Sequence, residues 1–244
     1  MKVFKKLRTA RISSEFQELT VRQMRELCAM SDRAMEAATT RLLTFVMSHD
    51  EGAMVKDPRL MTVQERARAL CHYLGTVIEG GPNFKVGEYL YSDFIEFDRD
   101  YSGPSVSTGE FAGESAIMCD QLLGVHVELL EAVCSSEGDW RAGLMACQIR
   151  LAEDPAPDLV AMSDADRMTW IEGRMSSIMD MPSSQAVELW SAYEKGAAML
   201  QHFFIVDVDP HGIVFRTHGE EVRPGLGRFR ASSCVEKRAR VLFA

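Results

Sequence analysis

Residues 203–218 read FFIVDVDPHGIVFRTH, two apolar runs on either side of the turn residues Asp209-Pro210-His211-Gly212. Proline has its φ angle preset for the second position of a turn, and glycine suits the fourth position of a type I turn. The pattern therefore predicts a β-hairpin. Because a two-stranded hairpin is only marginally stable alone, it needs a helix or a third strand to rest on.

The N-terminal segment is the natural candidate for that third strand. Residues 1–12 alternate in the manner of an extended chain, with Val3, Lys5 and Leu7 on one face. Lysines are typical of an edge strand, where they discourage further pairing. We therefore expect the two ends of the chain to meet in a small sheet.

Most of the chain between these ends is predicted to be helical, from capping residues and the spacing of apolar residues. Thr20 with Gln23 and Thr62 with Glu65 form capping boxes, Ser163 is the expected cap of a later helix, and Ser183 or Ser184 caps the next. We expect helices at about residues 21–30, 33–46, 63–79, 114–134, 139–151, 164–179 and 184–201, extended structure at 84–97, and loops at 49–60 and 98–113.

These elements predict an α+β protein, mostly helical, with an N-terminal strand and a C-terminal β-hairpin that form a small sheet. Residues 1–152 would hold the strand, a helical region and a mid-chain irregular or β segment, and residues 158–244 two helices and the hairpin. At 244 residues one core can serve the whole chain, so we expect one composite domain.

Charge and composition exclude several classes of protein. The net charge is −9, and the basic ends (+5 for residues 1–12, +4 for 216–244) leave −18 for residues 13–215. An acidic body would repel phosphate, so no nucleic-acid partner is expected. No stretch is apolar enough to cross a membrane, and the N-terminus lacks the pattern of a secretory signal, which predicts a protein of the cytoplasm.

Motifs for catalysis, cofactors or metals are missing from the sequence. There is no GxSxG, GxxxxGK[ST] or GxGxxG motif, so we expect neither an enzyme nor a cofactor. The six cysteines are widely spaced without a CxxC pair. Asp207, Asp209, His211 and His218 cluster near the hairpin, but their places on the strands and turn do not bring two ligands together, so no metal site is expected.

Methionine is the more informative residue type, with 15 in the chain. Methionine side chains on helix faces provide adaptable apolar surface that can pack against a partner or fill a helical core. We expect apolar contacts with a partner protein to involve Met24, Met35, Phe45, Trp190 and Tyr193, although the same residues would also serve as core.

The order of elements resembles the baseplate hub assembly proteins of contractile-tailed phages of the T-even type. The residues that carry the resemblance are Leu19-Thr20-Val21-Arg22, Leu60-Met61-Thr62-Val63, Lys85-Val86-Gly87-Glu88, His202-Phe203-Phe204 and Gly225-Leu226 before Phe229. The resemblance also implies paired cysteines around the hairpin, whereas this chain has Asp209-Pro210-His211-Gly212 there.

The resemblance implies a protein without catalytic residues that helps the central hub or the tape-measure complex of the tail to form in the host cytoplasm. Its partners would be phage tail proteins, and it could form homo-oligomers. Two alternatives remain open: a permanent structural subunit of the mature tail or baseplate, and an enzyme with an unrecognised site.

Overall fold

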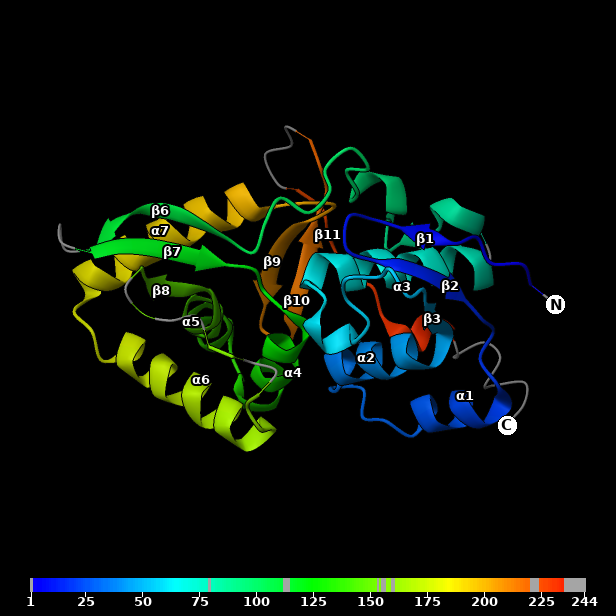
Figure 1. Cartoon of the computed structure of the whole chain (residues 1–244), viewed down its shortest axis with the longest axis horizontal. Coiled ribbons are helices and arrows are strands. Elements are labelled where there is room, and N and C mark those ends of the chain that lie inside the picture. The colour runs from blue at the N-terminus through cyan, green and yellow to red at the C-terminus, as the bar shows by residue number, and fades with distance from the viewer. Residues whose placement is uncertain are drawn as a thin grey trace.

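A computed structural model describes residues 2–78, 80–111, 115–152, 154, 157–158, 161–219 and 224–234 (Figure 1). It shows an α+β fold in which helices surround several small antiparallel sheets. The helices are α1 (Val21–Cys28), α2 (Met35–Val46), α3 (Val63–Val77), α4 (Gly124–Val133), α5 (Glu137–Gln148), α6 (Asp164–Met179) and α7 (Ser183–Leu200), with short 3-10 turns at Pro58–Leu60, Gly81–Asn83, Tyr91–Asp93 and Ala231–Cys234.

The capping residues start the helices as predicted, except at α2 and α7. α2 was predicted from residue 33 but begins at Met35, with Ala34 in the cap position. Thr20 and Thr62 both form capping boxes, and the N–H of Asp166 donates to the Ser163 hydroxyl (3.2 Å) at the start of α6. The cap of α7 was predicted wrongly, because Pro182 holds that position and Ser183 is already the first helical residue. The carbonyl of Pro182 accepts the first bond of this helix, from the N–H of Ala186 (3.0 Å).

The N-terminal strand does not join the hairpin, contrary to the prediction. β1 (Leu7–Arg8) pairs with β2 (Ser13–Phe16), and β2 pairs with β3 (Met47–His49). A tight turn reverses the chain, since the N–H of Thr9 donates to the carbonyl of Ile12 (2.9 Å). This turn brings residues 13–16 beside the first strand. The first strand therefore pairs with the segment that follows it in the sequence and not with the distant hairpin.

The helix predicted over residues 114–134 is confirmed only at its end, where α4 runs from Gly124 to Val133. Part of the predicted loop and the start of that helix are instead strands: β6 (Ser105–Phe111) pairs with β7 (Ser115–Asp120), and β7 pairs with β8 (Ile149–Leu151) from later in the chain. Ile117 and Cys119 are buried while Met118 and Asp120 are half-exposed, which is the period of two that a strand requires. The extended segment predicted at 84–97 is shorter: β4 (Lys85–Val86) pairs with β5 (Tyr89–Leu90).

The hairpin prediction is confirmed. β9 (Ile205–Asp209) pairs with β10 (Gly212–Arg216) around the turn residues Pro210 and His211. Gly212 has a φ of +116°, a conformation that favours glycine. The third strand is β11 (Leu226–Gly227), which pairs with the far side of β10. The sheet order β11-β10-β9 therefore leaves β9 at an edge.

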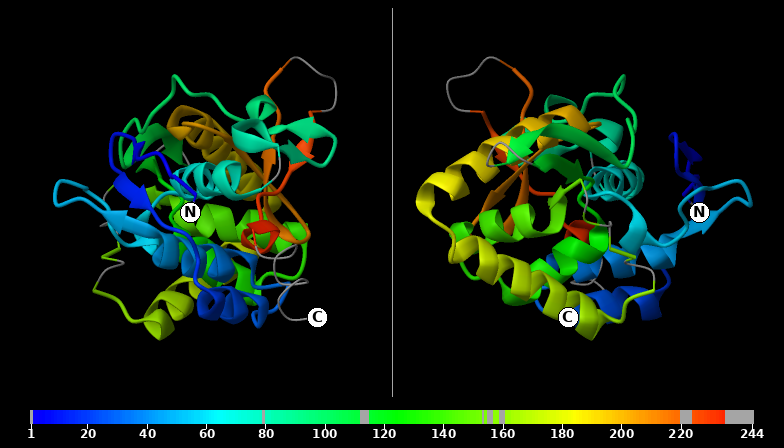
Figure 2. Two further views of the ribbon diagram at one scale, coloured as in Figure 1. Left: turned by 90° about the vertical axis from the view of Figure 1, so that its right-hand side faces the viewer. Right: turned by 60° about the vertical axis from the view of Figure 1, so that its left-hand side comes forward.

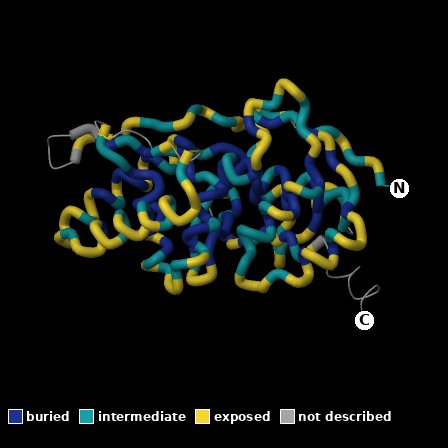
Figure 3. Tube along the Cα trace, turned by 60° about the horizontal axis from the view of Figure 1, so that its bottom comes forward, coloured by how far each residue is buried: buried dark blue, intermediate teal, exposed yellow. Residues whose placement is uncertain are grey.

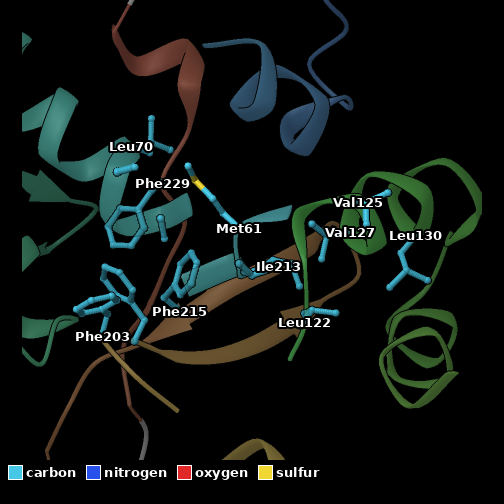
Figure 4. Packing of buried hydrophobic residues seen from close by; sticks show 14 of the residues in the cluster. Met61, Leu70, Leu122, Val125, Val127, Leu130, Phe203, Ile213, Phe215 and Phe229 are labelled. Carbon is cyan, nitrogen blue, oxygen red and sulfur yellow. The ribbon is translucent and has the colours of Figure 1, made fainter. Parts of the chain in front are cut away.

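Buried residues run through the middle of the molecule along its length (Figure 3). Around the hairpin, Phe203, Phe215 and Phe229 lie on the same side as Leu70 of α3, and Ile213 lies toward Val127 of α4 (Figure 4). The rings of Phe215 and Phe229 are stacked with centroids 5.1 Å apart. Residues on both sides of 152–158 share this core.

The left-hand part of Figure 1 has α5 between α6 and α7, and the turned view in Figure 2 agrees. α7 lies across β6 and β7, whereas α6 packs on α5. α6 buries only Ile171 and Ile178 out of 16 residues. None of the described helices is long and apolar enough to cross a membrane.

Candidate functional site: the groove between α7 and β9

The structure has a cavity of about 180 Å³ between the C-terminal half of α7 and the edge strand β9. The ends of β7 and α5 and the start of α3 complete its walls. We call it the β9–α7 groove; its lining includes Gln64, Gln121, Gln148, Trp190, Tyr193 and Val206. Its residues come from distant parts of the sequence, so the groove exists only once the whole chain has folded.

One wall is fixed by the close approach of α7 to the β6–β7 sheet. A Cβ at Gly196 would overlap the side chains of Cys119 and Thr108, so only glycine allows the helix to lie this near. The ammonium of Lys195 donates to the carbonyl of Thr108 (3.0 Å) and secures the same contact. This packing directs Tyr193 and Ala197 toward β9 as lining residues.

The other wall is set by an unusual backbone turn between α7 and β9. Phe203 has a φ of +48°, a left-handed conformation that costs roughly 1–2 kcal/mol for a residue with a Cβ. The peptide is held on both sides, because its N–H donates to the carbonyl of Arg99 (3.1 Å) and its carbonyl accepts from the N–H of Glu96 (2.8 Å). This clamp redirects the chain from the helix into the strand.

The backbone of β9 presents unpaired groups to the groove. Backbone groups of successive residues in a strand point alternately to the strands on its two sides. At the end of β10 the N–H of Thr217 donates to the carbonyl of Gly225 (2.9 Å), on the side of β11. The backbone groups of Arg216 and Val214 therefore point to the other side, toward β9. In β9, Ile205 lies opposite Arg216 and Asp207 lies opposite Val214, so the backbone groups of these two β9 residues bond to β10. The backbone groups of Val206 and Val208 therefore face the open edge. The Val208 N–H is taken by the carboxylate of Asp207 (2.8 Å).

Three glutamines form the polar floor of the groove, each more than nine-tenths buried. Gln121 Nε2 donates to the carbonyls of Gly103 (3.1 Å) and Leu200 (3.4 Å), and Gln148 Nε2 donates to the carbonyl of Asp120 (2.9 Å).

The orientation of Gln64 is the reverse, because its Oε1 accepts from the N–H of His202 (2.8 Å). In the described part of the chain the other ends, Gln121 Oε1, Gln148 Oε1 and Gln64 Nε2, have no hydrogen-bond partner, and none of them is sealed off from solvent. The floor therefore offers two acceptors and one donor.

The rim of the groove combines aromatic and charged side chains. The rings of Trp190 and Tyr193 lie with centroids 4.9 Å apart, and the guanidinium of Arg141 lies 5.2 Å from the Trp190 ring. Asp207 is 3.5 Å from Arg216. Glu194 is exposed and forms no ion pair within the described residues. The rim therefore carries one excess negative charge.

A buried polar cluster supports the groove from behind. His202 is completely buried, and its Nδ1 donates to the carbonyl of Leu200 (3.0 Å) while its Nε2 accepts from the Thr62 hydroxyl (2.9 Å). Burial lowers the pKa of His202, in keeping with this neutral form. Glu65 lies beside it with Arg11 at 3.3 Å, and burial raises the pKa of this carboxyl.

A second charged cluster joins helices at a distance from the groove. Arg66, of which 1% is exposed, lies 3.2 Å from Glu36 and 3.5 Å from Glu128. Glu128 also contacts Arg59 (3.1 Å), which reaches Asp164 (2.8 Å). Every charge here faces an opposite charge of the chain itself, so the cluster connects α2, α3, α4 and α6 structurally.

The predicted contact residues lie in two separate places. Trp190 and Tyr193 line the groove together. Met24 is buried on α1, and Met35 and Phe45 are half-buried on α2, on the other side of the molecule (Figure 1). The guanidinium of Arg41 covers the ring of Phe45 at 4.6 Å. The five residues therefore do not form one surface.

Near the hairpin, Asp209 pairs with Arg228 (2.5 Å) and His218 with Glu96 (3.1 Å). Across the part of the chain that the structure describes, no three His, Cys, Asp or Glu side chains gather in a geometry for a metal ion. Asp209 and His218 are thus engaged in contacts within the chain.

The glutamine floor and the open edge of β9 were not predicted from the sequence. Gln64 stands next to the Thr62 capping box, but nothing in the spacing of Gln121 and Gln148 signals that they meet it. Comparisons of the chain with protein-family models, curated proteins and solved structures found no match. The resemblance to baseplate hub assembly proteins stays a prediction from the sequence.

Proposed function

We propose that the protein binds another polypeptide in the β9–α7 groove and that it does so during assembly of a phage tail. The observation that carries the proposal is the floor of three buried glutamines, each with one end of its amide fixed and the other open. Amides do not titrate near neutral pH, so this floor suits binding rather than proton transfer. The open ends include acceptors and a donor, the two kinds of group that another polypeptide can hydrogen-bond.

The size of the cavity favours a short stretch of chain as its occupant. Cavities for drug-sized ligands and cofactors span roughly 300–1,000 Å³, whereas this one has about 180 Å³. A cavity of that volume takes one side chain with its flanking backbone. Trp190 and Tyr193 at the rim add the aromatic surface that commonly dominates the energy of protein interfaces.

The place of this activity in tail assembly is supported by the order of sequence elements. The segments around Thr20, Thr62 and Val86 follow one another as in the baseplate hub assembly proteins that the chain resembles. On this proposal the partner is a hub or tape-measure protein of the same phage, held until the tail forms.

Co-purification with co-expressed hub and tape-measure proteins tests the proposal. Trp190→Ala should reduce capture of the partner at least about tenfold, since removal of an aromatic anchor typically costs 1–2 kcal/mol or more. Phe45→Ala is the matched control, because Phe45 is also half-buried with an arginine over its ring. Thermal unfolding of both variants separates loss of binding from loss of folding.

Capture of a hub or tape-measure protein that W190A loses and F45A keeps would support the proposal. Capture of neither protein by the wild type would overturn the tail-assembly role. Equal losses in the two variants would overturn the groove as the binding surface. Mass spectrometry of purified particles then separates a transient assembly protein, which is absent, from a permanent subunit.

A further inference from the structure

We propose that the β9–α7 groove binds an extended segment of the partner that pairs with β9 and places an arginine side chain in the cavity. This inference rests on the proposed function and names the chemistry of the segment that the groove selects. It follows from the free edge of β9, from the acceptors in the floor and from the charge of the rim.

The free edge of β9 supplies the main-chain part of the recognition. Val206 N–H and C=O and the Val208 C=O face away from β10, and the described residues offer them no hydrogen-bond partner. A partner strand can satisfy these three groups, the common mode in which extended peptides add to sheet edges. The Val208 N–H is already bonded to Asp207, so pairing is limited to the start of the strand.

The floor of the cavity favours a ligand side chain with several hydrogen-bond donors. Two of its three open amide ends, Gln121 Oε1 and Gln148 Oε1, are acceptors, and backbone partners fix both orientations. An acceptor that is desolvated by a ligand without forming a bond costs about 1–3 kcal/mol. A guanidinium has five N–H donors in one plane, more than enough to satisfy two acceptors.

The rim supplies a complementary charge. Asp207 is partly neutralised by Arg216, and Arg141 by Glu137 (2.6 Å), so Glu194 remains as the excess negative charge. Hydrogen bonds between a guanidinium and a carboxylate are stronger than those between neutral groups. The ring of Tyr193 lines the same space and provides a surface on which a guanidinium can stack.

Titration calorimetry with capped pentapeptides of the sequence Val-Thr-X-Thr-Val tests the inference on the full-length protein. With X as arginine we expect measurable binding, with lysine weaker binding, and with glutamine or glutamate at least about tenfold weaker binding, because one charge-assisted bond is worth roughly 1.5–3 kcal/mol. The arginine peptide N-methylated at its central residue should bind at least about tenfold more weakly if strand pairing contributes.

Two variants separate the side-chain and main-chain contributions. Glu194→Gln should reduce the affinity for the arginine peptide severalfold and leave that for the glutamine peptide unchanged. Glu172→Gln, on the exposed face of α6, is the matched control and should change neither. Val206→Pro removes an N–H that faces the open edge, where proline is tolerated, and should weaken every peptide.

The outcomes distinguish this inference from the proposed function. Equal binding of the arginine and glutamine peptides, or full binding of the N-methylated peptide, would overturn the inference. If a tail protein is captured by the wild type and equally by E194Q and V206P, the proposed function stands and the inference fails. If no tail protein is captured while the arginine peptide binds selectively, the tail-assembly role fails and the inference stands.

Discussion

His126 and Glu131, both on α4, titrate with shifted pKa values of opposite sense. Burial, together with the smaller effect of the nearby Arg167, lowers the pKa of His126 to about 4. Burial raises the pKa of Glu131 to about 7, although its carboxylate accepts hydrogen bonds from the N–H groups of Glu36 (2.9 Å) and Ala37 (3.4 Å) at the start of α2. The two residues therefore act oppositely on the pH dependence of stability.

The sign of each effect follows from which state binds more protons. Between pH 4 and 6.5 the unfolded chain binds more protons at His126, so this residue makes the free energy of unfolding rise with pH. Between pH 4.5 and 7 the folded chain binds more at Glu131, so this residue makes it fall. Glu131→Gln removes the falling contribution.

We therefore expect the stability of E131Q relative to the wild type to increase as pH rises from 4.5 to 7. The change should be about 1 kcal/mol once solvent screening of this partly exposed group is allowed for. Urea denaturation at several pH values measures it. A difference between the two proteins that is constant over this range would contradict the raised pKa of Glu131.

Gly196→Ala should destabilise the protein by about 1–3 kcal/mol, the usual cost of forcing extra atoms into a packed contact. The new methyl group would push α7 away from Cys119 and Thr108. Gly173→Ala on α6 is the control, because nothing lies near a Cβ there, and it should stabilise by roughly 0.5–1 kcal/mol through helix propensity. Thermal and urea unfolding check both variants, and equal effects would refute the close packing of α7.

For single residues, the sequence predicts the helix caps but not the glutamines in the floor of the groove. Thr20 and Thr62 act on residues three positions away, so their roles are visible in the local pattern. Gln64, Gln121 and Gln148 acquire their roles from carbonyls that lie 18 or more positions away in the chain, and from an amide N–H 138 positions away. Such roles appear only after folding.

Among the elements, the two capping boxes differ in what surrounds them. Thr20 is exposed, whereas Thr62 is completely buried and also bonds His202. We expect Thr20→Ala to cost about 1 kcal/mol for the lost cap. Thr62→Ala should cost about 2–3 kcal/mol, because it also leaves a buried nitrogen of His202 without a partner.

Urea denaturation of the two threonine variants provides the measurement. The same local motif is removed in each, so the difference between the losses reports the bond to His202. Losses of the same size would mean that this bond contributes nothing to stability.

The helices were easier to predict than the strands for a physical reason. α3, α6 and the hairpin carry their own start, stop or turn signals within a few residues. β6 is rich in serine and glycine and becomes a strand only because β7 lies beside it, while β7 in turn pairs with β8 some 30 residues later. Pairing between distant residues leaves little trace in local composition.

For the molecule as a whole, the buried charges of Arg66, Glu36 and Glu128 determine how α2, α3 and α4 fit together. Arg66→Met should cost about 3–5 kcal/mol, since it leaves the Glu36 carboxylate without its partner, whereas Glu128 keeps Arg59. The double variant with Glu36→Gln as well should recover at least half of that loss. Urea denaturation tests this, and a double variant less stable than R66M would contradict the pairing.

The class of the molecule was predicted correctly, whereas the meeting of its two ends was not. An α+β fold follows from helical periodicity combined with the hairpin signal. The location of the N-terminal strand depends on the turn at residues 9–12, which supplies a closer partner than the hairpin. β11 takes the place that the prediction gave to that strand, and it is only two residues long, too short to be recognised in a sequence.

The small number of buried residues in α6 affects where the native structure opens locally. α3 buries ten of its 15 residues, whereas α6 buries two of 16 and rests mainly on α5. Local opening is easiest where few apolar contacts must be given up. The backbone amide hydrogens of α6 should therefore exchange with deuterium long before those of α3, and the earliest cleavage by a protease within a long helix should fall there.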